Sequence, residues 1–216
     1  SMGEGYGPMV VAPQAIDPQD LSGKLIAVPG IMTTAFLGLR LAIGNFRFRV
    51  VPFDRILDEV AAGRADAGLI IHEGQLTYEA EGLELVCDLG VWWQEETGLP
   101  LPLGGNCIRR SFGPEKIARV SKILKDSIVY GLEHREEALA HALQYARDMT
   151  GDLADRFVGM YVNQDSLRLG EDLREDAPVR GEAIAGFLRG ARDLLLERVG
   201  EPAQTLRRFP DLLCFS

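Results

Sequence analysis

The residues best suited to chemistry in this 216-residue chain are His72 and Glu73, which directly follow the apolar run at residues 67–71. An apolar run of this length, ended by Gly74, predicts a buried strand of the parallel kind in an α/β sheet. Ligands of open α/β sheets bind at the carboxyl ends of the strands, where this polar pair would lie. A histidine there can exchange protons near neutral pH, or it can simply hydrogen-bond to the backbone.

A second candidate site is the turn between an expected strand, which ends at Pro29-Gly30, and the helix that follows it. Thr33 and Thr34 open this helix, and threonine is a preferred N-cap residue. A turn followed by a hydroxyl-capped helix leaves backbone amides pointing at an anion, so a carboxylate or a phosphate could bind. The alternative is an ordinary cap, which stabilises a helix by about 1 kcal/mol and binds nothing.

These candidates are positioned by a predicted alternation of strands and helices. Strands are expected at residues 24–28, 48–53 and 67–71, with amphipathic helices at residues 33–43 and 54–62 between them. Short β-α-β-α-β connections are typical of a parallel open sheet and bring the three strand ends to one edge. We therefore expect His72 to share an edge with Thr33 and Thr34.

The remaining segments are predicted to have structural roles and not to bind a ligand directly. Glycines at residues 3–7 come before a short strand, which is the wrong order for a dinucleotide-binding fingerprint, and they are expected to permit tight backbone turns. Trp92 and Trp93 suit packing more than stacking on a ligand. The sequence Leu-Pro-Leu-Pro-Leu at residues 99–103 predicts a stiff extended crossing. Apolar periodicity then predicts helices at residues 114–133, 135–149, 152–162 and 179–199.

Composition excludes several function classes. The net charge of −9 argues against a nucleic-acid partner, and no run of 18 apolar residues is present to span a membrane. The three cysteines have no metal-ligand spacing, so we expect reduced thiols in a cytoplasmic protein. His134 and His141 have charged neighbours on predicted helices and are expected to be solvated.

Seven blocks of the sequence resemble the MqnD family, the 1,4-dihydroxy-6-naphthoate synthases of the futalosine route to menaquinone, within the wider MqnA/MqnD family. The blocks, in order, are residues 5–12, 27–35, 54–57, 67–73, 88–93, 97–104 and 161–163. They include Gly-Tyr-Gly-Pro, Met-Thr-Thr-Ala, Ile-Ile-His-Glu and Leu-Pro-Leu-Pro-Leu-Gly. Because the blocks occur in family order over most of the chain, the resemblance is far more specific than any one motif.

The resemblance implies a two-lobed α/β fold like that of type-II periplasmic binding proteins. It predicts a larger lobe at residues 1–21 and 104–216, a smaller lobe at residues 22–103, and hinge crossings near residues 13–22 and 99–105. Family members carry a further N-terminal segment before the Gly-Tyr-Gly-Pro block, and we expect this fold to lack it. An exposed sheet edge would then favour association, so a homo-oligomer is a further expectation.

The family's activity implies a carbon-carbon lyase that converts cyclic dehypoxanthine futalosine to 1,4-dihydroxy-6-naphthoate without a metal or an organic cofactor. His72 matches the family's proposed base, and a histidine suits that role. The implied residues that contact the small-molecule carboxylate substrate are Thr33, Thr34, Ala35, Ile71 and Leu103. Glu73 could orient His72 or only cap a turn.

Two other interpretations are compatible with these residues. One is a chorismate dehydratase of the same fold, like MqnA. The other is a non-catalytic protein that captures a carboxylate at Thr33 and Thr34, for which His72 would be dispensable.

Overall fold

The computed structural model describes residues 1–146, 149–163, 166–167 and 212–215. The described chain divides into two compact units. Residues 3–103 form the sheet unit, whereas residues 1–2 and the described residues from 104 onward form the helical unit. Residues 3–21, which the sequence analysis assigned to the larger lobe, are grouped here with residues 22–103. The division into lobes with hinge crossings stays a prediction.

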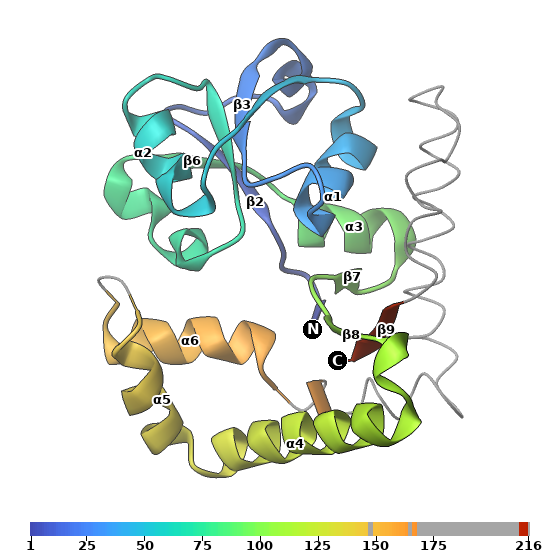
Figure 1. Ribbon diagram of the computed structural model, residues 1–216. Coiled ribbons are helices and arrows are strands. Elements are labelled where there is room, and N and C mark those ends of the chain that lie inside the picture. Colours follow the sequence, from blue (N-terminus) through green and yellow to red (C-terminus); the bar gives the residue numbers. More distant parts are fainter. Residues whose placement is uncertain (147–148, 164–165, 168–211, 216) are drawn as a thin grey trace. The chain divides into compact units, whose positions relative to one another are not determined.

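The sheet unit holds one five-stranded sheet with the order β4-β3-β5-β2-β6, and helices cover both of its faces (Figure 1). Its elements in chain order are β2 (Met9–Ala12), η1 (Pro18–Gly23), β3 (Leu25–Val28), α1 (Thr34–Ile43), β4 (Arg47–Val50), η2 (Phe53–Arg55), α2 (Ile56–Ala61), β5 (Ala67–Ile70), η3 (Glu73–Leu76), η4 (Tyr78–Glu81), β6 (Glu84–Asp88) and α3 (Leu89–Thr97), where η marks a 3₁₀ helix. The short strands β1 (Met2–Gly3) and β7 (Leu101–Pro102) lie at the two ends of this stretch. The predicted β-α-β-α-β order from β3 to β5 is confirmed.

The sheet is mixed, whereas a parallel sheet was expected. β3 pairs in parallel with both β4 and β5, but β2 is antiparallel to β5 and to β6. Met9, at the start of β2, lies opposite Ile70 at the end of β5 and Asp88 at the end of β6. The carboxyl ends of β3, β4, β5 and β6 therefore meet the amino end of β2 at one edge, which we call the carboxyl edge.

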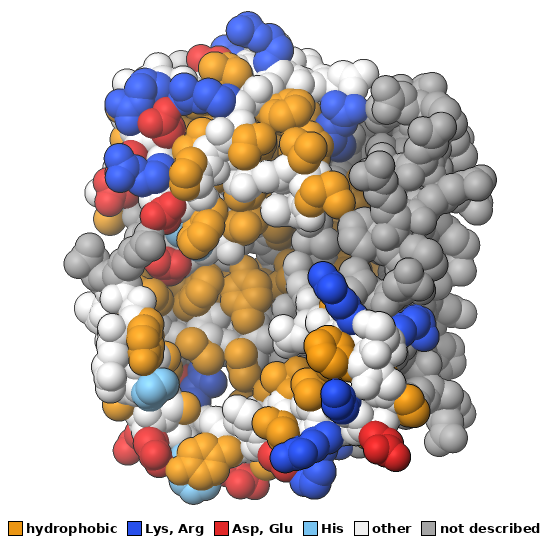
Figure 2. Space-filling model, viewed as in Figure 1, with side chains coloured by type: hydrophobic (Ala, Val, Ile, Leu, Met, Phe, Trp, Pro, Cys, Tyr) orange, Lys and Arg blue, Asp and Glu red, His pale blue; other side chains and the backbone are white. Residues whose placement is uncertain are grey.

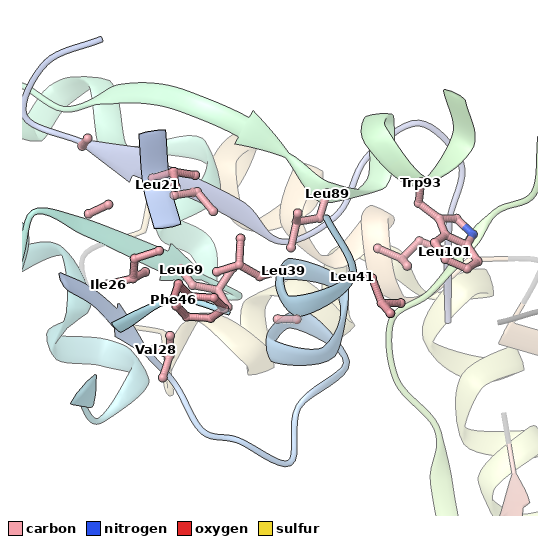
Figure 3. Close-up of a cluster of buried hydrophobic side chains, with 14 residues drawn as sticks. Leu21, Ile26, Val28, Leu39, Leu41, Phe46, Leu69, Leu89, Trp93 and Leu101 are labelled. Atoms are coloured by element: carbon pink, nitrogen blue, oxygen red, sulfur yellow. The ribbon is translucent and has the colours of Figure 1, made fainter. Parts of the chain in front are cut away.

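Alternation along the strands divides the core between the two faces of the sheet. Val10 of β2 and Leu69 of β5 belong to a cluster with α1 and α3, part of which Figure 3 shows. Val11 and Ile70, their neighbours in sequence, belong to a second cluster with α2. Both faces of β5 are thus covered, which explains why its four residues are all buried and why the sequence forms a continuous apolar run.

Several helix and strand boundaries differ by a few residues from the predicted ones, for identifiable reasons. The strand predicted at residues 48–53 ends at Val50, because Pro52 cannot donate to a sheet ladder. The helix predicted to begin at Asp54 has no side-chain cap and starts as the 3₁₀ turn η2 before α2. Trp93 is buried in the core with Leu89 and Leu101, as expected for a packing residue (Figure 3).

The helical unit contains β8 (Asn106–Arg109), η5 (Arg110–Phe112), α4 (Pro114–Glu133), α5 (Arg135–Leu143), α6 (Gly151–Tyr161) and β9 (Leu212–Phe215). The prediction for α4 is confirmed at both ends, whereas α5 is shorter than predicted. α5 contacts both α4 and α6, and β8 pairs antiparallel with β9. The helix predicted at residues 179–199 lies outside the described residues. His134 and His141 are both exposed, as predicted.

Candidate functional site

His72 lies two residues after β5 and is the N-cap residue of the 3₁₀ helix η3. Its Nδ1 atom accepts a hydrogen bond from the backbone N–H of Gly74 at 3.0 Å, and its carbonyl accepts one from the N–H of Gln75 at 2.9 Å. A nitrogen that accepts carries no proton, so the neutral ring holds its proton on Nε2 and its basic lone pair on Nδ1. The His72 side chain is 11% exposed. The predicted base is therefore held in one orientation by its own backbone turn.

Glu73 lies beside the same ring nitrogen. One carboxylate oxygen of Glu73 is 3.8 Å from Nδ1 of His72, and the Glu73 side chain is partly exposed. A neutral imidazole accepts the Gly74 N–H, whereas an imidazolium would present an Nδ1–H to this carboxylate. Glu73 is thus placed to stabilise the protonated ring; whether it orients His72 stays a prediction.

Gln75 connects the His72 turn to the glycine-rich loop before β2. It is 2% exposed, and its side-chain amide donates to the carbonyl of Gly7 at 2.6 Å. The backbone amide of Gly7 in turn acts on the Asp88 carboxylate, whose pKa it lowers. The sequence analysis did not identify Gln75, because a single glutamine after a strand carries no periodic or motif signal of its own.

Asp88, the last residue of β6, binds the start of α3 at the same edge. Its Oδ1 accepts from the N–H groups of Gly90 at 2.7 Å and Val91 at 3.3 Å, and so caps α3. Burial raises the pKa of the Asp88 carboxyl above its ordinary value, although hydrogen bonds from Gly90, Val91 and Gly7 act to lower that pKa. We call the set of His72, Gln75, Gly7, Asp88 and Gly90 the clamp.

The clamp is closed by direct contact between backbones. A Cβ atom added at Gly90 would lie 2.0 Å from the carbonyl oxygen of Tyr6, and one added at Gly7 would lie 2.7 Å from the amide nitrogen of Gly90. Real Cβ atoms essentially never come so close to backbone atoms, so both positions require glycine. At Gly7 the glycine is required by this backbone contact and not by a turn, whereas Gly5, with a φ of 72°, has the left-handed conformation expected of a glycine turn.

The predicted Thr33 cap is also present, at the start of α1. Thr33 Oγ1 accepts from the N–H of Phe36 at 3.0 Å and donates to the carbonyl of Gly30 at 2.9 Å. Thr34 Oγ1 donates to the carbonyl of Leu103 at 2.9 Å, which joins two of the residues implied to bind substrate. Both hydroxyl protons thus point at backbone carbonyls, and an anion at this turn would have to rely on backbone amides.

The other residues implied to contact substrate are partly or fully buried. The side chain of Ala35 belongs to the core, so only its backbone amide, in the first turn of α1, is suited to an anion. Ile71 and Leu103 are partly buried and pack against the same core cluster. The topology brings the Thr33 turn and His72 to one carboxyl edge, as predicted, because β3 and β5 are parallel neighbours.

Phe53 is a further residue at this edge that the sequence analysis missed. It lies just after β4, its ring centroid is 5.8 Å from that of His72, and the residue is 49% exposed. Ile31 and Met32, in the turn after β3, are 56% and 65% exposed. We call Ile31, Met32 and Phe53 the shelf. The sequence analysis treated each only as part of a strand or a turn, because sequence periodicity does not reveal which apolar residues stay exposed.

Other regions supply fewer functional features. A cavity of about 400 Å³ in the helical unit is lined by Ser1, Gly104, Gly105, Asn106, Leu124, Ile128, Tyr161, Val162 and Ser166. None of the predicted site residues lines it. Within the described ranges, no group of three His, Cys, Asp or Glu side chains is arranged to hold a metal ion, and no helix is long and apolar enough to cross a membrane.

Comparisons with solved structures identify the fold. Protein AF1704 from Archaeoglobus fulgidus is 40% identical and superposes with a TM-score of 0.80 over 93% of this chain and 71% of that chain. The alkanesulfonate-binding protein SsuA from Xanthomonas axonopodis pv. citri is only 14% identical, with a TM-score of 0.59 over 93% of this chain and 68% of that chain. The fold is therefore that of the type-II periplasmic binding proteins, as predicted.

Comparisons with curated sequences identify the relatives. A 1,4-dihydroxy-6-naphthoate synthase from Thermus thermophilus is 44% identical over 172 residues, which cover 80% of this chain and 62% of the relative. A 1,4-dihydroxy-6-naphthoate synthase from Streptomyces coelicolor is 36% identical over 210 residues, covering 94% of this chain and 71% of the relative. The chain thus spans about two thirds of the length of these proteins. A family model described as menaquinone biosynthesis matches residues 1–176, and this chain belongs to that family.

Proposed function

We propose that this chain takes part in menaquinone biosynthesis as a carbon-carbon lyase that forms 1,4-dihydroxy-6-naphthoate from cyclic dehypoxanthine futalosine. The observation that carries the proposal is the clamp, which holds a histidine of defined tautomer at the carboxyl edge of the sheet. Two 1,4-dihydroxy-6-naphthoate synthases among its relatives support the same reaction. The proposed reaction uses no metal ion and no organic cofactor.

In this proposal, His72 transfers a proton within the substrate. The Nδ1 atom first gives up its hydrogen bond from the Gly74 N–H, and its freed lone pair removes a proton from the sugar part. The ring then gives that proton back to the leaving fragment as the carbon-carbon bond breaks. Protonation of Nδ1 places an N–H group beside the Glu73 carboxylate. Glu73 would thereby stabilise the intermediate state of the base without contacting the substrate.

The substrate carboxylate would bind at the first turn of α1. The amides of Thr34 and Ala35 lie in that turn, where helix amides favour negative charge. Thr33 holds the turn, while Ile71 and Leu103 would border the binding site. In this proposal the carboxylate and the base lie at the ends of the neighbouring strands β3 and β5.

A non-catalytic anion-binding protein is the second candidate. The observation that favours it is the fold shared with an alkanesulfonate-binding protein. In that case the anion would bind at the Thr33 turn, and His72 would serve only to cap its own turn. The two candidates therefore differ in what the imidazole contributes.

The test compares His72→Asn with His72→Ala and with the parent chain. Asparagine keeps an acceptor for the Gly74 N–H but is no base, whereas alanine removes both functions. Incubation with cyclic dehypoxanthine futalosine, followed by chromatography of 1,4-dihydroxy-6-naphthoate, should show a loss of about 100-fold or more for both variants. Urea denaturation should show that only His72→Ala loses cap stability, of about 1 kcal/mol.

Two outcomes would contradict the proposal. If His72→Asn keeps the activity of the parent within a few fold, the imidazole is not the base. If the parent chain makes no product but binds aromatic carboxylates at the Thr33 turn, the binding-protein candidate is favoured.

A further inference from the structure

The shelf residues lie on segments that meet at the carboxyl edge. Ile31 and Met32 follow β3, Phe53 follows β4, and His72 follows β5, and these three strands are parallel neighbours in the order β4-β3-β5. A backbone hydrogen bond of 2.9 Å from Val51 to Val28 ties the ends of β4 and β3 together. Phe53 thus reaches the histidine from two strands away, over the end of β3.

The ring contact between Phe53 and His72 leaves much of the phenyl group exposed. The two rings are tilted by 55°, so they do not cover each other face to face, and about half of the Phe53 side chain stays accessible. Ile31 and Met32 are still more exposed. Figure 2 shows hydrophobic side chains among Lys and Arg side chains on the visible surface of the molecule. An accessible aromatic ring in contact with a histidine suits a flat, apolar ligand group.

The tryptophan pair is less suited to this role. Trp93 is buried in the core, and its ring lies 6.2 Å from that of Trp92 in a tilted arrangement. Trp92 is itself packed against the same core cluster. Of these aromatic residues, Phe53 is the one that combines high exposure with a contact to His72.

We propose that the shelf binds the flat aromatic ring system of a fused-ring carboxylate, with Phe53 as its stacking residue beside His72. This inference rests on the proposed function for the identity of the ring system, but it concerns recognition and not proton transfer. It makes Phe53 a residue that determines specificity for aromatic over saturated ligands. Offset or edge-to-face contact with the phenyl ring would supply that preference.

The test uses 2-naphthoate as the flat probe and cyclohexanecarboxylate as a saturated carboxylate of similar charge. Binding to the full chain is followed by NMR through the carbon-bound ring protons of His72, which are assigned by their absence in His72→Asn. We expect 2-naphthoate to shift these resonances. Phe53→Leu should weaken 2-naphthoate binding about fivefold, as expected for the loss of one aromatic pair. Binding of cyclohexanecarboxylate should stay the same.

Phe112→Leu is the matched control. Phe112 is also a half-exposed phenylalanine on a 3₁₀ turn, η5, but it belongs to the helical unit. It should leave binding of both probes unchanged. Equal weakening of both probes by Phe53→Leu, or no weakening of either, would overturn the inference.

Binding of 2-naphthoate requires no turnover, so the two proposals can fail separately. Phe53-dependent binding in a chain that forms no dihydroxynaphthoate would support the shelf and contradict the lyase. Lyase activity in a chain whose binding of 2-naphthoate does not depend on Phe53 would support the lyase and contradict the shelf.

Discussion

The clamp and the shelf lie at the same sheet edge, yet they are built in opposite ways. In the clamp, buried and partly buried hydrogen bonds of 2.6–3.0 Å and contacts between glycine backbones hold His72 and its neighbouring loops. In the shelf, three large apolar side chains stand exposed on turns. This difference matches the two roles proposed for them. Chemistry needs a fixed proton acceptor, whereas recognition of a flat ring needs an accessible apolar surface.

Gly90→Ala should have the largest effect on stability, because the backbone of Gly90 contacts the backbone of Tyr6 in the clamp. The new methyl group would lie 2.0 Å from the Tyr6 carbonyl oxygen, so either α3 or the glycine loop must move. We expect the free energy of unfolding to fall by about 3 kcal/mol or more, measured by urea denaturation. Gly23→Ala is the control, because no atom lies within 4 Å of its added Cβ. Similar losses in both variants would show that the clamp is not packed as described.

Asp88→Asn tests the pH dependence of stability, because the clamp contains a partly buried carboxyl group and the shelf contains none. Because the folded-state pKa of Asp88 is raised, its stabilising contribution is present below the ordinary aspartate pKa of about 3.9 and is lost as the pH rises through the folded-state pKa. The parent chain should therefore lose stability relative to Asp88→Asn between acid and neutral pH. Urea denaturation of both proteins at a series of pH values measures this difference. A parent that gains on the variant as the pH rises would show that the Gly90, Val91 and Gly7 hydrogen bonds outweigh burial.

Met32→Ala should have the smallest effect on stability. Met32 is among the most exposed apolar side chains described, so its truncation should change the free energy of unfolding by no more than about 0.5 kcal/mol. Affinity for 2-naphthoate should fall about twofold to threefold, through lost apolar contact with the ligand. The same urea denaturation and NMR titration measure both values. A large loss of stability would mean that the shelf is packed like the clamp, and the contrast would disappear.

Much of the sheet unit follows from local sequence signals. The apolar run that became β5 and the threonine that caps α1 are each set by residues close together in the chain. The order of strands and helices from β3 to β5 follows from the same kind of signal. For this reason the sequence alone predicted that His72 and Thr33 lie at one edge.

What the sequence did not predict depends on contacts between distant residues. The insertion of β2 between β5 and β6 joins residues far apart in the sequence, as the register pairs of Met9 with Ile70 and with Asp88 show. The Gln75 bond to Gly7 has a similar separation. The sequence also does not predict the exposure of Phe53, because an apolar residue after a strand is expected in the core until the surrounding surface is known.

The central position of β2 also has a consequence for synthesis of the protein. A ribosome makes β2 before both strands that flank it, because β5 and β6 follow tens of residues later. At about 5–20 residues per second, β2 waits for several seconds without its partners. Until then Met9–Ala12 lacks both strands that flank it in the folded sheet, and the carboxyl edge is assembled only after Asp88 has emerged.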